Sequence, residues 1–369
     1  MSKKILFFIK VPPPTTGATL INMYVLESEI LKKAFDISIL PISYMKSRKS
    51  MGKYEFCKIL IIFSVFFKLL NELVFNRPKL IYFQISPKNL AFIRDLLYVS
   101  LIKIFRVKIV FHIHGKGINN IAKSKVKGAL YRYAFKNSDI IILSSLLSYD
   151  IKDVFNGKVY IVHNGIPDVV SLINVTNKKS LSLSPIKLVF LSNLIMAKGI
   201  LDYIESLKLL KNSKIKFEGI IVGAEADLSE KEINFIIERE SLNDDLKYIG
   251  PKYGKDKYDI LVSSDMLIYP TINDAFPLVV LEAMQFGLPI IATEEGAIPE
   301  IIEDGVTGFL VEKNNPNQIA NKIEYLLKNP ELIAKMGIES RKKYEQEYTL
   351  GHFERNMKAT FDKIFAEID

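Results

Sequence analysis

Hydrophobic residues along the chain fall into short, nearly continuous runs separated by longer stretches with helical periodicity. Apolar runs without strict alternation are typical of parallel strands that are covered on both faces. The repeated strand–helix order therefore predicts an α/β fold with two doubly wound parallel sheets. The expected strands lie at residues 4–9, 80–85, 108–115, 139–145 and 159–165, and then at 187–194, 217–223, 247–250, 266–271 and 289–293.

A polar stretch rich in Ser, Asn and Lys, NVTNKKSLSLSP at 174–185, separates the two sets of strands and is the predicted linker. It divides an N-terminal domain, 1–173, from a C-terminal domain, 186–349. Ligands of such sheets bind beyond the carboxyl ends of the strands, so we expect a binding cleft between two facing domains. The last segment, 350–369, has the periodicity of an amphipathic helix.

One helical stretch, KILIIFSVFFKLLNELVF at 58–75, is apolar except for a narrow stripe of Ser64, Lys68, Asn71 and Glu72. The polar residues interrupt it before the ~18–20 apolar residues of a membrane span accumulate. A helix buried beside the sheet explains the pattern. Because KSRKSMGK at 46–53 supplies four basic residues next to it, peripheral contact of residues 46–75 with an anionic membrane explains it equally well.

Charge divides unevenly between the two halves of the chain. Residues 1–170 contain 26 Lys and Arg against 10 Asp and Glu, whereas the whole chain has a net charge of +9. A basic first half favours a polyanionic partner, such as a phosphate-bearing substrate or a membrane surface. No aromatic stacking pattern or basic recognition motif accompanies the charge, so we expect no nucleic-acid partner.

The remaining composition is that of a globular protein, with 49% hydrophobic and 25% charged residues. A single cysteine, Cys57, excludes an internal disulfide framework. The N-terminus MSKKILFFIK has too short an apolar run for a secretory signal. These features predict a cytoplasmic protein, with the inner face of the cytoplasmic membrane as a second expected location.

The stretch NDAFPLVVLEAMQFGLPIIAT at 273–293 places two acids, Asp274 and Glu282, at the ends of one apolar segment. Pro277 favours the first position of a helix that ends at Gly287. The first turn of that helix is an anion site, because its backbone N–H groups have no acceptor within the helix. Acids beside a phosphate site fit a sugar attached to a phosphate, although solvated acids on an ordinary strand–helix unit are the simpler reading.

The run DAFPLVVLEAMQFGLPIIATEEGAIPEIIEDGVTGFLV at 274–311 resembles the signature block of retaining GT-B glycosyltransferases of family four. In that family two glutamates flank seven residues; Glu282 matches the second and Asp274 replaces the first. The chain also has Pro277 and Gly296-Ala297 where relatives carry glycines. Six shorter segments resemble the family in the same order: VPPPTTGAT, HIHG, VHNGI, FLSNLIMAKG, IIVG and YIGPKYGKDK.

For the C-terminal domain the resemblance implies the donor site. Lys198 would contact the diphosphate, Asp274 the donor sugar and Glu282 the ribose, while Asn193 stands where relatives carry an arginine. The backbone around Phe276, Pro277, Leu278 and Val279 would complete the pocket, and Gly223, Gly250 and Lys252 would lie near the base.

For the N-terminal domain the resemblance implies that Gly17 and Ala18 face the diphosphate, with Thr16 and Thr19 as candidate side-chain donors. His114 would contact the transferred sugar, and His112 would belong to the core. In relatives the C-terminal helix crosses back onto this domain. The chain has no Asp-x-Asp motif and no acid or cysteine near the histidines, so we expect neither a metal ion nor another cofactor.

The resulting hypothesis is a metal-independent GT-B glycosyltransferase, EC 2.4 and of hexosyltransferase type. It would move a sugar, with retention, from a nucleotide-diphosphate sugar to a hydroxyl of a glycan. The basic N-terminal half favours a polyprenyl-diphosphate-linked acceptor in bacterial capsule, exopolysaccharide or lipopolysaccharide synthesis. A sugar-nucleotide epimerase and a non-catalytic lipid-binding protein are the alternatives. A dehydrogenase is disfavoured, because GKGINN at 115–120 lacks the third glycine of the dinucleotide fingerprint.

Overall fold

The computed structural model describes residues 3–42, 55–170 and 185–368, and the chain divides into two compact units. Unit 1 comprises residues 1–165 and 350–369, and unit 2 comprises residues 166–349. The sequence-based boundary lay at 173/174, eight residues further along. The predicted linker lies outside the described residues except for Pro185, as do the four basic residues at 46–53.

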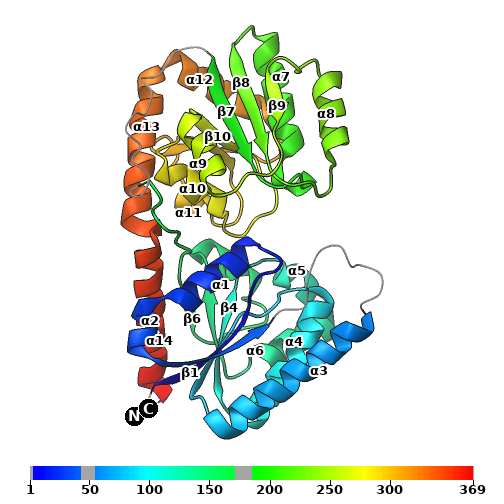
Figure 1. Ribbon diagram of the computed structural model, residues 1–369, viewed down its shortest axis with the longest axis vertical. Helices are drawn as coiled ribbons and strands as arrows, with labels where there is room; N and C mark the ends of the chain where they lie inside the picture. Colours follow the sequence, from blue (N-terminus) through cyan, green and yellow to red (C-terminus); the bar gives the residue numbers. More distant parts are fainter. Residues whose placement is uncertain (1–2, 43–54, 171–184, 369) are drawn as a thin grey trace. The chain divides into compact units, whose positions relative to one another are not determined.

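Unit 1 is built on a six-stranded parallel sheet in the order β2-β1-β3-β4-β5-β6 (Figure 1). Its strands are β1 (Lys4–Lys10), β2 (Asp36–Ile42), β3 (Leu80–Phe83), β4 (Lys108–Ile113), β5 (Asp139–Ile142) and β6 (Val159–Ile161). Its helices are α1 (Gly17–Glu27), α2 (Glu29–Ala34), α3 (Glu55–Asn71), the π-helical η1 (Glu72–Asn76), α4 (Asn89–Ile104), α5 (Ile118–Ala122), α6 (Lys125–Phe135), the 3-10 helix η2 (Ser145–Asp150) and α14 (Leu350–Ile368).

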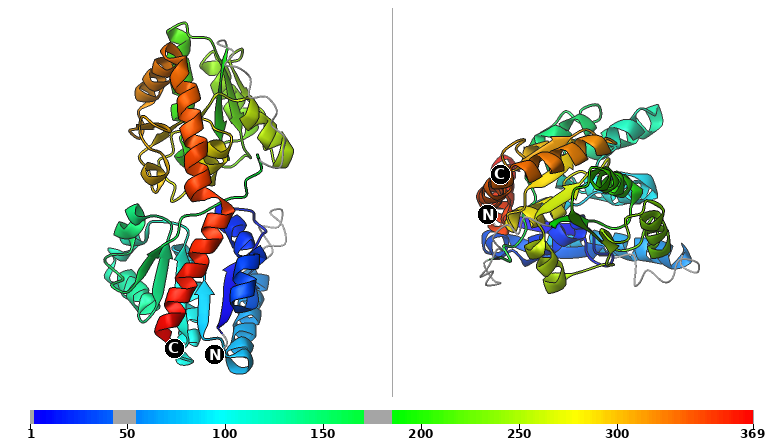
Figure 2. Two further views of the ribbon diagram at one scale, coloured as in Figure 1. Left: turned by 90° about the vertical axis from the view of Figure 1, so that its left-hand side faces the viewer. Right: turned by 90° about the horizontal axis from the view of Figure 1, so that it is seen from above.

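Alternating residues of β1 show how the sheet of unit 1 is covered on both faces. Phe7 packs against Phe361 of α14 on one face, with ring centroids 6.0 Å apart. Phe8 packs against Tyr98 of α4 on the other, at 5.3 Å. The C-terminal helix therefore belongs to the core of unit 1, and Figure 2 shows it lying along the strands of that unit.

The strand β2 was not predicted from the sequence. Only its first four residues, DISI, alternate between polar and apolar, and of the seven residues DISILPI only Leu40 and Ile42 are buried. It is the edge of the sheet, where a strand has a paired neighbour on one side only and a proline is tolerated, so the continuous apolar run expected of a central strand is missing.

Unit 2 is a second six-stranded parallel sheet, in the order β12-β11-β10-β7-β8-β9. Its strands are β7 (Ile186–Leu191), β8 (Phe217–Val222), β9 (Leu246–Tyr248), β10 (Met266–Tyr269), β11 (Ile290–Thr293) and β12 (Gly308–Val311). Its helices are the 3-10 helix η3 (Met196–Lys198), α7 (Ile200–Asn212), α8 (Glu230–Arg239), α9 (Gly254–Ser263), α10 (Leu278–Gln285), α11 (Ile298–Ile301), α12 (Pro316–Lys328), α13 (Pro330–Lys343) and the π-helical η4 (Tyr344–Tyr348). Two doubly wound, Rossmann-like parallel sheets confirm the predicted fold class.

Both sheets have a topological switch point, where the chain leaves neighbouring strands in opposite directions. In unit 1 it lies between β1 and β3, and in unit 2 between β7 and β10. In folds of this kind, ligands bind in the crevice beyond the carboxyl ends of the strand pair at the switch point.

Candidate active site

At the switch point of unit 2, a lysine from one loop meets an aspartate from the other. Lys198 ends η3, just after β7, and Asp274 lies in the loop that follows β10. The Lys198 Nζ is 2.5 Å from the Asp274 Oδ2, and both side chains are largely buried. The Tyr269 hydroxyl donates to the same Oδ2 at 2.7 Å. Burial and the charge of Asp274 raise the pKa of Tyr269 well above its usual value, so the phenol stays a donor.

The two loops are joined by their backbones as well as by this ion pair. The Ala197 carbonyl accepts hydrogen bonds from the Ile272 N–H at 2.9 Å and from the Thr271 hydroxyl at 3.1 Å. Gly199 has a positive φ of 82° and lies against Pro270, where an added Cβ would be 2.0 Å from the Pro270 oxygen. Only glycine fits this backbone and this contact. The position of Lys198 therefore depends on close packing between the two loops.

The Asp274 loop is held from its other side by a buried carboxylate that the sequence analysis did not single out. Glu295, which follows β11 and is buried, accepts the Asp274 N–H at 3.1 Å. Its second oxygen pairs with the Lys313 Nζ. Next to it, Gly296 has a φ of 56° and approaches the Asp274 carbonyl more closely than any Cβ would allow. In the sequence, Glu295 could have been singled out as the acid directly before Gly296.

Helix α10 begins at Leu278, one residue later than predicted, because Pro277 is the N-cap and has the extended backbone of a cap. The predicted end near Gly287 is confirmed, since Gly287 has a φ of 63° two residues after the last helical one. Phe276 and Leu278 are buried, and Val279 is half-buried. By helix geometry the N–H groups of the first turn, at Leu278 and Val279, have no acceptor within the helix.

Glu282 lies on α10 and is paired with Lys257 of α9, another residue missed from the sequence. The Lys257 Nζ and the Glu282 Oε1 are 2.8 Å apart, and less than a fifth of each side chain is exposed. A ribose that used Glu282 as its acceptor would compete with this ammonium group.

Three predicted donor-site residues come together at the carboxyl ends of β7, β8 and β9. The Gly223 N–H donates to the Gly250 carbonyl at 3.1 Å. The Asn193 Oδ1 accepts the N–H of Ala224 at 3.2 Å, so Asn193 holds the neighbouring loop. Gly223 packs so closely that an added Cβ would lie 1.8 Å from the Ser192 oxygen. Lys252 is half-buried in the loop after Gly250.

In unit 1, His114 follows β4 and its ring lies 3.9 Å, centroid to centroid, from that of His112. Burial, and then the charge of Lys10, lower the pKa of His114 to about 3. Its Nε2 is shielded from solvent and has no hydrogen-bond partner among the described residues. His112 is fully buried, as predicted, and its Nδ1 is 2.6 Å from the Tyr82 hydroxyl. At neutral pH both imidazoles are therefore uncharged.

The loop after His114 is fixed by Asp150. The carboxylate of Asp150 accepts the N–H groups of Gly117, Ile118 and Asn119 at 2.8–3.1 Å and is almost fully buried. A carboxylate that receives several backbone donors at the start of a helix is strongly held. Asp150 thus limits the movement of the segment that leads from His114 to α5.

Helix α1 begins at Gly17, with Ala18 as its second residue. Thr16 and Thr19 form a capping box: the Thr16 Oγ1 accepts the Thr19 N–H at 3.2 Å, and the Thr16 N–H donates to the Thr19 Oγ1 at 2.8 Å. The Thr19 hydroxyl also donates to the Pro14 carbonyl at 3.0 Å. These two threonines are the candidate side-chain donors of the sequence analysis, and in the structure their hydroxyls take part in starting the helix.

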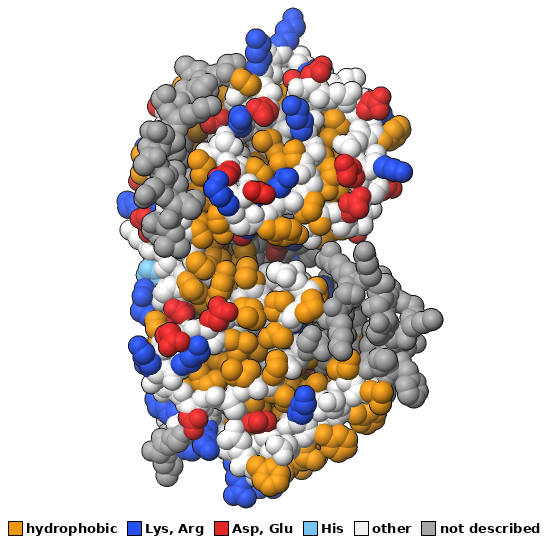
Figure 3. Space-filling view, in the orientation of Figure 1, with side chains coloured by type: hydrophobic (Ala, Val, Ile, Leu, Met, Phe, Trp, Pro, Cys, Tyr) orange, Lys and Arg blue, Asp and Glu red, His pale blue; other side chains and the backbone are white. Residues whose placement is uncertain are grey.

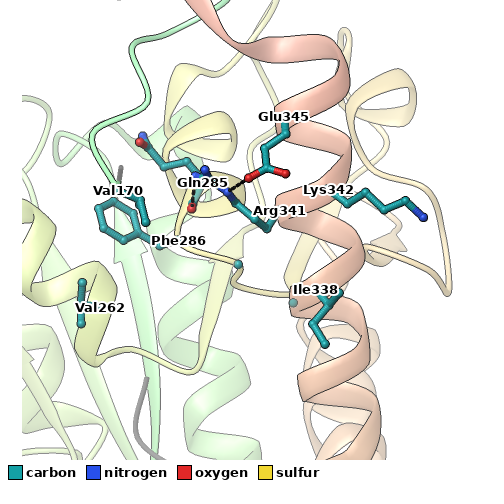
Figure 4. A pocket seen from close by; sticks show the side chains of 10 residues that line it. Val170, Val262, Gln285, Phe286, Ile338, Arg341, Lys342 and Glu345 are labelled. Carbon is teal, nitrogen blue, oxygen red and sulfur yellow. Dashed lines mark hydrogen bonds and ion pairs between the residues drawn. The ribbon is translucent and has the colours of Figure 1, made fainter. Parts of the chain in front are cut away.

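A cavity of about 500 Å³ opens elsewhere in unit 2, at the C-terminal end of α10 (Figure 4). Arg341 of α13 lines it, donates to the Gln285 carbonyl at 2.8 Å and pairs with Asp168 at 2.6 Å. None of the predicted site residues lines this cavity. Within the described ranges, no three His, Cys, Asp or Glu side chains gather as metal ligands would. Likewise, none of the helices described has the length and apolar character needed to cross a bilayer.

Comparison with known proteins finds a family model and several relatives that resemble parts of this chain. Residues 174–343 match the family model for glycosyl transferases group 1. An uncharacterized glycosyltransferase of Methanocaldococcus jannaschii is 27% identical over 231 residues, which is 62% of this chain and 61% of that protein. The N-acetyl-alpha-D-glucosaminyl L-malate synthase of Bacillus anthracis is 27% identical over 249 residues, 65% of this chain and 64% of the synthase. The chain therefore spans less than two thirds of the length of either relative.

Three bacterial glycosyltransferases are 24–28% identical to this chain over shorter stretches. These stretches cover 43–49% of this chain and 41–46% of each relative. Their names place them in the biosynthesis of colanic acid in Salmonella typhimurium, amylovoran in Erwinia amylovora and capsular polysaccharide in Staphylococcus aureus.

Solved structures share the fold of the whole chain. The sucrose-phosphate synthase of Thermosynechococcus elongatus has a TM-score of 0.75 at 15% identity, covering 99% of this chain and 100% of that one. The Anabaena protein HepE, solved in complex with UDP-glucose, has a TM-score of 0.68 at 17% identity over 98% of this chain and 99% of its own. The whole chain thus shares the GT-B fold of these structures, and its residues 174–343 match the glycosyl transferases group 1 family.

Proposed function

We propose that the protein transfers a sugar from a nucleotide-diphosphate sugar to a hydroxyl of a glycan acceptor, with retention at the anomeric carbon. The observation that carries this proposal is the Lys198–Asp274 pair at the switch point of unit 2, next to the first turn of α10. A cation and an acid side by side suit a ligand with a diphosphate at one end and a polyhydroxyl group at the other. The solved complex of HepE with UDP-glucose supports the donor class.

The reaction breaks the bond between the anomeric carbon and the diphosphate oxygen and forms a bond from that carbon to the acceptor oxygen. The acceptor's proton moves to the departing diphosphate, so the protein need not supply a base. Lys198 and the N–H groups at the start of α10 would stabilise the negative charge that grows on the diphosphate. These positive groups replace a metal ion in the proposal.

The carboxylates would orient the donor. The Asp274 Oδ2 is held by Lys198 and Tyr269, and the Asp274 N–H is held by Glu295, so the carboxylate is oriented before a sugar arrives. Glu282 would accept the ribose hydroxyls after exchanging its contact with Lys257. In unit 1, Gly17 and Ala18 at the start of α1 would serve the diphosphate, and the neutral imidazole of His114 would contact the transferred sugar.

The experiment that tests the donor site is thermal unfolding with a panel of nucleotides and nucleotide sugars. A ligand at 100 times its Kd stabilises the folded state by about 2.7 kcal/mol. The shift should disappear in Lys198→Ala and Glu282→Gln, and it should remain in Lys255→Ala, an exposed lysine on α9. A folded wild type that responds to no nucleotide would sink the proposal and favour a non-catalytic protein.

Retention and acceptor choice need product analysis. A product with the anomeric configuration of the donor is expected by NMR, and none should form without an acceptor. Conversion of the nucleotide sugar alone into its epimer would instead establish an epimerase. We propose a polyprenyl-diphosphate-linked glycan of a bacterial surface polysaccharide as the acceptor, supported by the polysaccharide pathways named for relatives.

Such an acceptor lies in a membrane, and unit 1 has a surface suited to meeting one. The outer faces of α3 and α4 expose large apolar side chains, many of them more than half exposed: Leu60, Phe63, Phe67, Leu90, Leu97 and Ile104. Figure 3 shows hydrophobic side chains along α3. Lys68 of α3 and Arg106, two residues after α4, are also exposed, and exposed cations together with apolar side chains favour anionic lipid.

Flotation with vesicles tests the membrane contact. The protein should bind vesicles that contain phosphatidylglycerol and should bind phosphatidylcholine vesicles less. Phe67→Glu should weaken this binding, whereas Phe235→Glu, on an equally exposed phenylalanine of α8, should not. Equal flotation of both variants would overturn the assignment of the contact to α3 and α4.

A further inference from the structure

Four polar residues that the proposed mechanism does not use form a cluster in unit 1. The Lys10 Nζ, at the end of β1, donates to the Ser86 Oγ, just after β3, at 2.6 Å. Arg94 of α4 donates to the same Oγ at 3.2 Å and, through its Nε and one terminal nitrogen, to the Asp95 Oδ1 at 2.9 and 2.6 Å. The Asp95 Oδ2 accepts the Ser86 N–H at 2.7 Å. The cluster thus ties together the ends of two strands and a helix.

The position of the cluster is that of a ligand site. Lys10 and Ser86 bridge the carboxyl ends of β1 and β3, which is the switch point of unit 1. In unit 2 the corresponding place, between β7 and β10, is occupied by Lys198 and Asp274. Each sheet therefore has an ammonium group where the topology opens a crevice for a ligand.

Two cations of the cluster, Lys10 and Arg94, share one buried carboxylate, that of Asp95. Arg94 pairs with the completely buried Asp95 at 2.6 Å, and Lys10 pairs with the same carboxylate at the longer distance of 3.8 Å. Only about a quarter of the Lys10 side chain is exposed. Burial, opposed in part by Asp95 and reinforced by Arg94, lowers the pKa of Lys10 to about 8. Burying an ammonium group whose counterion is shared and 3.8 Å away is unfavourable, so an arriving anion would reduce this cost.

The surroundings of the cluster add further donors. Gly115, directly after His114, lies against Pro87, so the loop that contains His114 reaches the residue following Ser86. After burial, the charge of Lys10 is the second cause that lowers the pKa of His114. The Nε2 of that imidazole lacks a partner among the described residues.

We propose that Lys10, with Ser86 and Arg94 beside it, binds an anionic group of the acceptor, either a carboxylate or a phosphate. Charge-assisted hydrogen bonds from the Lys10 ammonium would hold one oxygen of this anion, and Asp95 would keep Arg94 and Ser86 in place. That the anion belongs to an acceptor rests on the proposed function, whereas the anion site itself does not. The proposal thus assigns named residues of unit 1 to the recognition of an anionic group on the acceptor.

Competitive labelling of lysine amines tests the site on the intact wild-type protein. The protein is acetylated briefly with acetic anhydride, and the modification of each lysine is measured by mass spectrometry. Inorganic phosphate and succinate are the probes, and chloride at the same ionic strength is the control. A bound anion raises the pKa of the Lys10 amine, and each pKa unit lowers the reactive fraction about tenfold. We therefore expect saturable protection of Lys10 by about tenfold or more.

Lys4 is a matched internal control, because it lies at the opposite end of β1 and donates to the Asn76 carbonyl. Its labelling should not respond to either probe. Protection by phosphate alone would assign a phosphate site, and protection by succinate alone a carboxylate site. Equal labelling of Lys10 in phosphate, succinate and chloride would overturn the proposal.

Two variants separate this inference from the function. Ser86→Ala removes the hydroxyl between the two cations and should weaken protection of Lys10, whereas Ser100→Ala, on the far part of α4, should leave it unchanged. Protection of Lys10 in a protein that no nucleotide stabilises would leave the anion site standing while the donor proposal failed. Undiminished protection of Lys10 in a folded Ser86→Ala protein would overturn the assignment of the site to this cluster.

Discussion

Gly199→Ala should disrupt unit 2 at the point where the candidate site is assembled. Gly199 has a φ of 82°, and a Cβ there would lie 2.0 Å from the Pro270 oxygen, whereas real Cβ contacts are essentially never under 3.0 Å. The left-handed backbone costs a non-glycine residue about 1–2 kcal/mol. Relief of the overlap requires a shift of about 1 Å in one of two packed loops, and such overpacking costs about 1–3 kcal/mol. The expected loss of stability is therefore about 2–5 kcal/mol.

Gly305→Ala separates the two contributions. Gly305 has a φ of 76°, close to that of Gly199, but no atom lies within 4 Å of its added Cβ. It should lose only the backbone part, about 1–2 kcal/mol. Urea unfolding of both variants measures the difference in the free energy of unfolding, provided that the transition is two-state.

The same shift should affect ligand binding, because Lys198 precedes Gly199 and reaches Asp274 across the joined loops. Gly199→Ala should lose stabilisation by the nucleotide that stabilises the wild type, and Gly305→Ala should keep it. Equal losses of stability in the two variants would refute the steric reasoning. Unchanged nucleotide stabilisation in Gly199→Ala would refute the link between this packing and the position of Lys198.

Three further predictions concern charged or titrating groups. The pKa of His114 is about 3 in the folded protein and about 6.5 when unfolded, so only the unfolded state gains a proton as the pH falls through that window. Stability should therefore decline below about pH 6.5, and His114→Gln should remove up to about 2 kcal/mol of the decline between pH 6.5 and pH 5. Urea unfolding at these two pH values measures it, and a decline in the variant equal to that of the wild type would contradict the reasoning. Glu295→Gln should lower stability by about 1.5–3 kcal/mol in the same assay, because it removes the ion pair between Glu295 and Lys313. It should also weaken nucleotide binding, because Glu295 accepts the N–H of Asp274; full nucleotide binding would argue that Glu295 does not position this loop. Lys257→Met should lower the melting temperature without ligand but enlarge the nucleotide-induced rise, because the ribose no longer competes for Glu282; a smaller rise would show that Lys257 itself contacts the nucleotide.

Features that depend on local order along the chain were accessible from the sequence. The apolar runs placed the central strands, since a parallel strand covered on both faces has no other pattern. Asp274 and Glu282 were singled out as the two ends of one apolar segment and Lys198 by the family resemblance, and the structure brings Lys198 and Asp274 together. The helix end at Gly287 followed from glycine's freedom at positive φ.

Features that depend on contacts between distant residues were not accessible. Lys257 meets Glu282 and Lys10 meets Ser86 only because neighbouring strands and helices align in register, at separations of 25 and 76 residues. Likewise, the sequence around Glu295 does not show that its carboxylate accepts the N–H of Asp274. The edge strand β2 was not predicted, because its mixture of polar and apolar residues reflects its position at the edge of the sheet, which the sequence alone does not show.

The sequence by itself thus determined the elements and the kind of chemistry at the strand ends. The tertiary structure decided which charges are partnered, because pairing depends on distances that only the packed sheets define. It also decided that Thr16 and Thr19 cap α1, since a hydroxyl bonds the nearest backbone group that the fold presents to it.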